Sequence, residues 1–157
     1  MNIVIMSGIS CSGKSTYVKE HSTEDSAVCS ADRYFTVGKW DPITKSASYT
    51  YNFDPTKLGE AHAACMKRFI EACHEDVGYD TLFVDNTNTT IIELAPYVAV
   101  ANAFGYRPDI VTIHCSAEEA HRRDNGHNVP LAAKQRMAQN IASREIPRFW
   151  NATIIDV

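Results

Sequence analysis

The sequence lacks the features that mark membrane-spanning, disulfide-stabilised and disordered proteins. No apolar run approaches the roughly 18 residues of a membrane span, and residues 1–5 lack the basic start of a signal peptide. The five cysteines are odd in number and never spaced C-x-x-C, which argues against a disulfide framework and a zinc site. Repeats, low-complexity tracts and Pro/Gly-rich linkers are absent too. We therefore expect a single domain over residues 1–157, located in the cytoplasm and without a membrane partner.

A large net charge of either sign is also missing from the chain as a whole. The formal net charge is −4 for 157 residues, which argues against a surface coated in nucleic acid. Residues 121–148 nevertheless hold six Lys and Arg against two acidic residues, whereas the chain before residue 121 sums to −7. A basic stretch in an acidic chain favours a local anion site, although a solvated helix face has the same composition.

Short apolar runs alternate along the chain with segments of helical spacing. The runs predict strands at residues 2–7, 27–30, 81–84, 109–115 and 152–156. Helices are expected from residue 14, after the Asp54-Pro55 cap, and at residues 90–104, 117–124 and 131–144, while residues 36–53 predict a loop or irregular hairpin. This alternation predicts an α/β fold in which helices flank a parallel five-stranded sheet. Functional loops then belong at the carboxyl ends of the strands.

Residues 8–16, GISCSGKST, match the phosphate-loop pattern G-x-x-x-x-G-K-[ST]. The segment follows a predicted strand and opens a predicted helix, so its backbone N–H groups and the helix N-terminus can converge on phosphate oxygens. Lys14 would reach the β- and γ-phosphates and the Ser15 hydroxyl would bind Mg²⁺. Cys11 is expected to face solvent without chemistry of its own. We expect ATP contacts from Gly8, Ser10, Cys11, Ser12, Gly13, Lys14, Ser15 and Thr16.

Two aspartates follow predicted strands at the edge where a parallel sheet places its active site. Asp32 comes just after the second strand and could accept the proton of an acceptor hydroxyl, although a turn carboxylate would look the same. Asp85 ends the third strand and could hold the magnesium shell together with Ser15. The Asn86-Thr87-Asn88 run that follows could bind substrate or cap the next helix.

The basic stretch supplies candidates for stabilising the charge that develops during phosphoryl transfer. Arg122 and Arg123 lie before the Gly126 turn, in a region that suits a lid, and Arg136 is a third candidate. Adjacent helical residues point about 100° apart, so we expect only one of the first two to face the phosphates. Alternating aromatics at residues 49, 51 and 53 suit either base stacking or a half-buried strand.

These elements, in this order, resemble the kinase module of phage polynucleotide 5′-hydroxyl kinases and their small AAA-type relatives. Besides the phosphate loop, the resemblance rests on SADRYF at 30–35, YNFDP at 51–55, DNTN at 85–88 and the 123–130 segment, and it covers nearly the whole chain. It implies a P-loop NTPase fold of the adenylate-kinase-like type, with a helical lid at approximately 117–142. It also implies Mg²⁺-dependent transfer of the γ-phosphate of ATP to a 5′-hydroxyl of DNA or RNA.

The resemblance assigns roles to residues of this chain and also meets departures. It implies Lys14 and Ser15 as phosphate and metal residues, Asp32 as general base, Asp85 as the acid near the acceptor strand and Arg123 as a lid arginine. The family's acceptor-phosphate arginine, three residues after the base, is Phe35 here, so Arg33 could substitute or Phe35 could stack on the terminal base. The expected substrate contacts are Arg33, Phe35, Asp85, Asn86, Asn88 and Arg136.

Three functions agree with the sequence. The first is a polynucleotide 5′-hydroxyl kinase, which the motif order and the basic stretch favour. The second is a P-loop kinase acting on a nucleoside, nucleotide or other small alcohol, which Phe35 and the acidic overall charge favour. The third is an NTP-dependent binding or switch protein, which does not require a base at Asp32.

Overall fold

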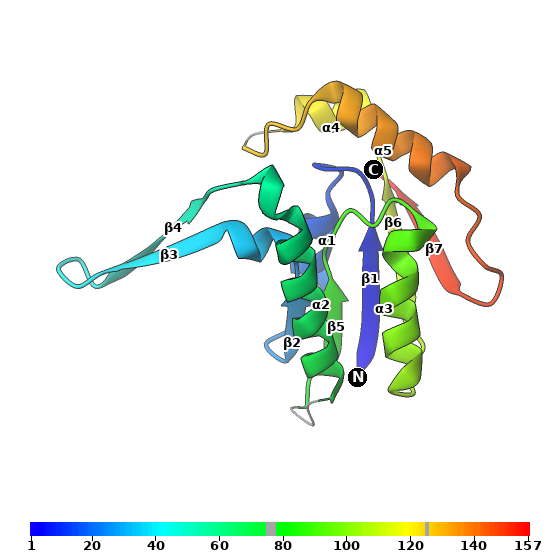
Figure 1. Cartoon of the computed structure of the whole chain (residues 1–157), viewed down its shortest axis with the longest axis horizontal. Coiled ribbons are helices and arrows are strands. Elements are labelled where there is room, and N and C mark those ends of the chain that lie inside the picture. Colours follow the sequence, from blue (N-terminus) through cyan, green and yellow to red (C-terminus); the bar gives the residue numbers. More distant parts are fainter. Residues whose placement is uncertain (75–77, 125) are drawn as a thin grey trace.

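Five parallel strands form the centre of the computed structural model, which describes residues 1–74, 78–124 and 126–157, the side chains of residues 40 and 41 apart. The strands lie in the order β2-β5-β1-β6-β7, with the first strand of the chain in the middle (Figure 1). Their bounds are β1 Asn2–Ser7, β2 Ser26–Cys29, β5 Thr81–Val84, β6 Asp109–His114 and β7 Asn151–Asp156. Every neighbouring pair in this sheet is parallel, so all five carboxyl ends meet at one edge, as the sequence predicts.

Helices cover both faces of this sheet. The helices α2 (Leu58–His74) and α3 (Ile91–Ala103) pack on one face, and α1 (Lys14–His21) lies on the other (Figure 1). Alternation along β1 makes the two cores possible, because Ile3 and Ile5 face α2 and α3 whereas Met6 packs with Val18 of α1. Two short 3₁₀ helices, η1 (Ala31–Phe35) and η2 (Pro55–Lys57), precede β3 and α2.

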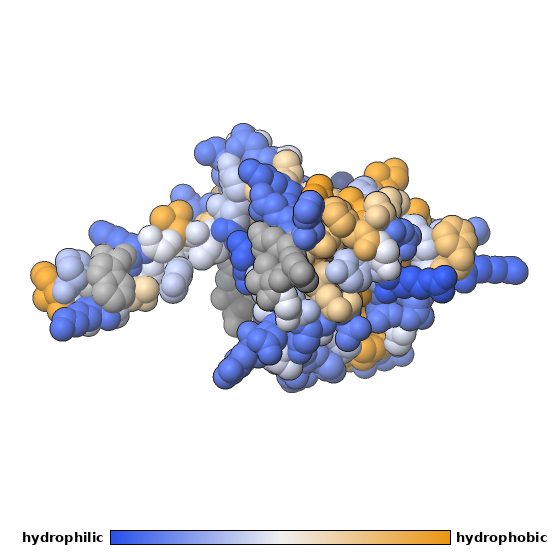
Figure 2. Space-filling view, turned by 90° about the horizontal axis from the view of Figure 1, so that it is seen from below, coloured by the Kyte–Doolittle hydropathy of each residue, from blue (hydrophilic) through white to orange (hydrophobic). Residues whose placement is uncertain are grey.

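The remaining two strands, β3 (Thr36–Asp41) and β4 (Ser46–Tyr51), form a separate antiparallel hairpin. The hairpin stands out from the body of the molecule as an arm (Figures 1 and 2). Its register is regular from Thr36↔Tyr51 to Asp41↔Ser46, so the expectation of a loop or irregular hairpin is replaced by an ordered ladder. The base of the arm is closed by the Asn52 N–H, which donates to the Phe35 carbonyl at 2.9 Å.

Two further helices, α4 (Ala117–Arg122) and α5 (Leu131–Ser143), arch over the carboxyl edge of the sheet (Figure 1). They occupy the expected lid region, of which residue 125 lies outside the described residues. Their shared core includes Ile9 of the phosphate loop, which packs with Cys115, Ala117 and Ala120. Lid and loop are therefore parts of one apolar cluster.

The elements expected from the sequence are confirmed, with ends that move by one or two residues. Local signals explain this agreement. Thr90 forms a capping box with Glu93 at the start of α3, and Gly105 lies beyond its end with a φ of 82°. Asp54 accepts a hydrogen bond from the Thr56 N–H before η2 and α2. Among the described residues, no helix is long and apolar enough to cross a membrane.

Candidate active site

The phosphate loop connects β1 to α1 along a backbone that few residues could follow. Gly8 has a φ of 149°, Cys11 of 66° and Gly13 of 107°, each in the left-handed half of conformational space. A Cβ at Gly8 would lie 2.7 Å from Ser12 Oγ and 2.8 Å from the Ile113 carbonyl oxygen. The first glycine of the motif is thus fixed by close packing against β6, and the second by the turn that opens α1.

Lys14 folds back across this loop. Its Nζ donates to the carbonyl oxygens of Ile9 at 2.7 Å and Gly8 at 3.0 Å, and its side chain is buried. Burial lowers the pKa of the Lys14 ammonium to about 8, and the charges of Asp85 and Asp32 oppose that shift. All three side chains are therefore within electrostatic reach of one another.

The Ser12 hydroxyl is a hydrogen-bond donor suited to an anion bound in the loop. Ser12 Oγ is buried and has no hydrogen-bond partner, although buried hydroxyls in folded proteins are nearly always paired. The Ser12 hydroxyl is unpaired among the described residues, and the Lys14 ammonium is held at the loop by two backbone carbonyls. Both groups can therefore donate hydrogen bonds to phosphate oxygens. The residues present therefore fit a nucleoside triphosphate.

Ser15 and Asp85 meet at the mouth of the loop. Ser15 Oγ donates to Asp85 Oδ2 at 2.7 Å, joining the start of α1 to the end of β5. Burial raises the pKa of the Asp85 carboxyl, partly offset by this hydrogen bond and by the charge of Lys14. A hydroxyl and a carboxylate are the oxygen ligands that Mg²⁺ prefers. The described residues contain no cluster of three His, Cys, Asp or Glu side chains suited to a metal, so protein ligands alone would complete little of its shell.

Asp32 lies on η1, beyond the end of β2. Its Oδ1 accepts a hydrogen bond of 3.2 Å from the Tyr51 hydroxyl, at the base of the hairpin. Burial and the charge of Asp32 raise the pKa of Tyr51 to about 12, so its hydroxyl stays protonated as the donor. The Tyr51 ring also contacts His127, with ring centroids 5.5 Å apart. Tyr51 thus links the candidate base to the lid.

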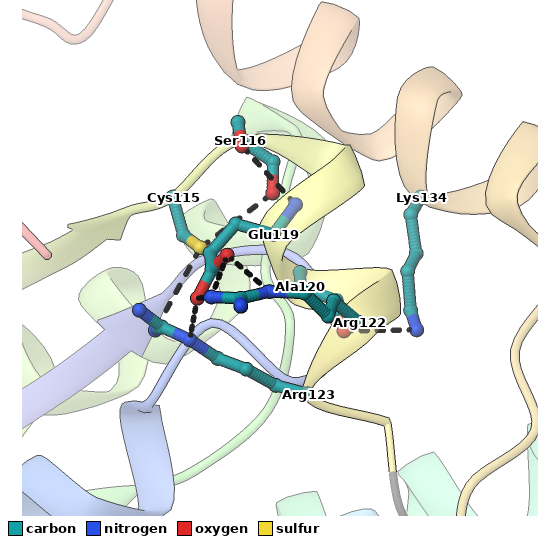
Figure 3. A network of polar contacts seen from close by, with 7 residues as sticks. All are labelled: Cys115, Ser116, Glu119, Ala120, Arg122, Arg123 and Lys134. Carbon is teal, nitrogen blue, oxygen red and sulfur yellow. Dashed lines mark hydrogen bonds and ion pairs between the residues drawn. The ribbon is translucent and has the colours of Figure 1, made fainter.

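The Glu119 carboxylate forms hydrogen bonds and ion pairs with both Arg122 and Arg123 (Figure 3). Arg122 donates to its carboxylate through Nε at 2.9 Å and Nη2 at 2.8 Å, and Arg123 through Nε at 2.6 Å. Both arginines reach the same carboxylate because Glu119 lies three and four residues before them, and both spacings bring side chains together on a helix. The expectation that only one of them faces the phosphates stays a prediction. The Arg123 side chain is 42% exposed and that of Arg122 78% exposed.

A buried ion pair ties the lid together. Lys134 is fully buried, and its Nζ donates to Asp124 Oδ2 at 2.7 Å and to the Ala120 carbonyl at 3.2 Å. Asp124 Oδ1 accepts from the backbone N–H groups of residues 126–128, and Oδ2 from that of Val129. One carboxylate thereby organises the connection between α4 and α5. Cys11, expected to face solvent, instead lies half-buried against this unit, and burial raises the pKa of its thiol.

Arg144, which the sequence places only in the basic stretch, fastens the end of α5 to the sheet edge. Its Nη1 donates to Ser7 Oγ at 2.8 Å and to the Asn88 and Thr89 carbonyls, and its Nη2 donates to Thr112 Oγ1 at 2.8 Å. These bonds use the guanidinium inside the protein. Arg144 is therefore a structural tie.

Three expected substrate contacts lie inside the protein. Asn86 accepts from the Ala31 N–H at 2.8 Å and donates to the Tyr97 hydroxyl at 3.2 Å, and Asn88 donates to the Met6 carbonyl at 2.8 Å. Phe35 is 4% exposed and packs into the core beneath the hairpin. These side chains support the strand ends in the structure, and their contact with substrate stays a prediction.

The other expected contacts are at the surface. Arg33 is exposed on η1, next to Asp32, and Arg136 is exposed on α5. Ser10 is half-buried and Thr16 exposed at the loop and the start of α1. The sequence does not predict Glu119 and Lys134 as site residues, and Tyr51 is expected from it only to stack on a base or to lie in a half-buried strand. Ser116 accepts from the Glu119 N–H as the cap of α4, so a Ser-x-x-Glu capping pattern signalled at least Glu119.

The parallel sheet with β1 at its centre and the phosphate loop between β1 and α1 together define a P-loop NTPase fold. More particularly, the chain belongs to the AAA domain family, whose sequence model matches residues 3–152. It is 29% identical to NEDD4-binding protein 2 of Homo sapiens over 107 residues, which are 67% of this chain. The match spans 5% of the length of that relative.

Solved structures share the fold at low identity. A sugar kinase from Janibacter sp. HTCC2649 matches with a TM-score of 0.60 and 15% identity, over 99% of this chain and 85% of its own. A gluconokinase from Sinorhizobium meliloti 1021 matches with a TM-score of 0.60 and 16% identity, over 99% and 82%. A chain of the Pnkp1/Rnl/Hen1 complex matches with a TM-score of 0.56 and 14% identity, over 82% of this chain and 40% of its own.

Proposed function

We propose that this chain is a kinase that transfers the γ-phosphoryl group of ATP to the hydroxyl of an alcohol, with Asp32 as the general base. The observation that carries the proposal is the meeting of Lys14, Asp32 and Asp85 at the carboxyl edge of the sheet, where both carboxylate charges act on the lysine. A nucleotide-dependent switch needs a phosphate loop and a metal ligand. It does not need a second carboxylate held beside them by Tyr51.

The proposed reaction gives each residue a task. Asp32 accepts the proton of the acceptor hydroxyl, the alcohol oxygen bonds to the γ-phosphorus, and the bond from that phosphorus to the bridging oxygen of ADP breaks. Lys14 and the loop N–H groups hold the phosphates in line. Arg123, released from Glu119, neutralises charge on the transferred group. Ser15 and Asp85 would hold Mg²⁺, which would supply positive charge against the phosphates during transfer.

Two acceptor classes have support. A small alcohol is favoured by the sugar kinase and the gluconokinase, which cover nearly all of this chain with the higher TM-scores. The 5′-hydroxyl of a polynucleotide is favoured by the motif order shared with phage polynucleotide kinases. The small alcohol has at least equal support, because Phe35 replaces the arginine that the phage enzymes use for the acceptor phosphate.

The test is transfer of label from γ-labelled ATP, with Mg²⁺, to a panel of acceptors. The panel contains 5′-hydroxyl DNA and RNA oligonucleotides with 5′-phosphorylated controls, nucleosides, nucleotides, sugars and sugar acids. Label on an acceptor hydroxyl supports the kinase, and the acceptor that takes it decides the class. ATP consumption that no acceptor stimulates contradicts the proposal and favours a switch.

A further inference from the structure

A cavity of about 340 Å³ lies between η1 and α2, beside the candidate base. Its lining includes Ser30 and Arg33, which flank Asp32 in the chain, together with Lys67, Arg68 and Glu71 from α2. Sequence patterns single out none of the α2 residues, because they lie on the exposed side of that helix. The topology nevertheless brings them next to the end of β2.

Two guanidinium groups converge on this cavity. The charges of Arg33 and Arg68 both act on the Cys29 thiol, which is buried at the carboxyl end of β2. Within the described ranges, neither guanidinium has an ion pair or hydrogen bond of its own. Lys67 is partnered by Glu71 at 3.9 Å, an exposed pair one helical turn apart. The cavity therefore carries two positive charges without a counter-ion.

This charge lies close to the proposed chemistry. Two residues of the lining, Ser30 and Arg33, flank Asp32 of η1. Ser30 Oγ accepts from the Asp32 N–H at 3.3 Å, which leaves the Ser30 hydroxyl hydrogen to donate to a ligand. A group bound in the cavity would thus contact residues that flank the proposed base in the chain.

We propose that this cavity binds an anionic group of the acceptor, so that the substrate is an alcohol carrying a carboxylate or a phosphate. The inference rests on the proposed function and narrows it. Two planar guanidinium groups match the paired oxygens of either anion. Sugar acids, nucleotides and polynucleotide ends fit this description, whereas neutral sugars and unphosphorylated nucleosides do not.

The experiment compares acceptors that differ only in the anion. Gluconamide is paired with gluconate, and a nucleoside with its 3′-monophosphate, and kcat/KM is measured for each. We expect the anionic member of one pair to be preferred at least about tenfold, since hydrogen bonds to charged groups discriminate by roughly that factor or more. Arg33→Gln and Arg68→Gln should each remove most of that preference. Lys19→Gln, which removes a positive charge from α1, is the matched control and should keep it.

Calorimetric titration of gluconate and the nucleoside 3′-monophosphate gives a second readout that needs no turnover. Binding by the wild-type chain that is lost in the double variant Arg33→Gln/Arg68→Gln supports the anion site, and the probe that binds identifies carboxylate or phosphate. If such binding occurs without transfer to any acceptor, the anion site stands and the proposed kinase function fails. Equal use of neutral and anionic acceptors, or equal losses on both in the variants, overturns the anion site and leaves the kinase function intact.

Discussion

The Ser15 hydroxyl and the Asp85 carboxylate are joined by a hydrogen bond of 2.7 Å across 70 residues of sequence. The bond forms because β1 and β5 are neighbours in the sheet and end at the same edge. It aligns two oxygen groups before any cation arrives, and burial raises the pKa of Asp85 at the same point. The cation binding proposed at this pair would favour the ionised form of the carboxyl.

Asp85→Asn should raise the Mg²⁺ concentration needed for half-maximal activity by about tenfold or more, because an amide cannot supply the anionic ligand. In the wild-type chain the same concentration should rise as the pH falls through the raised pKa of Asp85. A Mg²⁺ titration at several pH values measures both effects. Glu20→Gln, a charge loss on the exposed side of α1, serves as control. An unchanged Mg²⁺ requirement in Asp85→Asn would remove Asp85 from the metal site.

Asp32→Asn should leave ATP affinity near normal and lower phosphoryl transfer at least ~100-fold, the usual contribution of a positioned general base. Tyr51→Phe keeps the carboxylate but removes its hydrogen bond, and should cost a smaller factor, about two- to tenfold. Single-turnover transfer and equilibrium ATP binding separate the two effects. Retained turnover in Asp32→Asn would rule out its role as base.

ATP affinity should weaken above pH 8. Lys14 is half deprotonated at about that pH in the free chain, and bound phosphate favours its charged form. Binding therefore takes up a proton once the pH exceeds 8, and Kd should rise by up to about tenfold per unit toward pH 10. Lys14→Met should bind weakly at every pH and lose this dependence. A Kd that stays constant across the range contradicts the shifted lysine.

Arg123→Gln should lower kcat by about 10³-fold, the lower range for an arginine that stabilises the transferred phosphoryl group. Arg122→Gln should cost much less, because its side chain is the more exposed of the two. Arg148→Gln, an exposed charge loss beyond α5, is the control. Equal losses in the Arg122 and Arg123 variants would assign both to the phosphates.

Lys134→Met should lower the free energy of unfolding by about 3–5 kcal/mol, because removing one partner leaves the Asp124 carboxylate buried without its cation. Burial opposes ionisation of Asp124, but hydrogen bonds from Lys134 and the backbone hold its pKa well below the usual range. A lowered folded-state pKa stabilises the chain above pH 4, and this contribution is lost as the pH falls further. Urea denaturation of both chains between pH 7 and 3 tests the difference, which should shrink in acid.

The fold could be predicted from the sequence because its signals are local. The glycines of the phosphate loop, the Thr90 cap and the apolar runs each determine a short segment, and alternation of strands and helices determines the sheet. The positions of Lys14, Ser15, Asp32 and Asp85 at one edge follow from that topology. The strands that precede these residues are parallel, so their carboxyl ends all lie at the same edge of the sheet.

The roles of some polar residues could not be predicted from the sequence, because they depend on contacts between distant segments. Arg144 lies in the basic stretch, yet its partners on β1 and β6 use its guanidinium inside the protein. Asn88 looks like a polar strand-end residue, but the Met6 carbonyl takes its amide hydrogen. Chemical type alone does not separate a structural arginine or asparagine from one that binds substrate.

The β3–β4 hairpin is structurally separate from the central sheet. Its two strands bond to each other and to none of the five central strands, and the Asn52–Phe35 hydrogen bond closes the chain beneath it. Shortening or exchanging residues 37–50 would cut no rung of the central sheet, while the Tyr51 contact to Asp32 would stay in place. The hairpin can thus change in sequence or length without altering the central sheet, although its base contacts the proposed general base, Asp32.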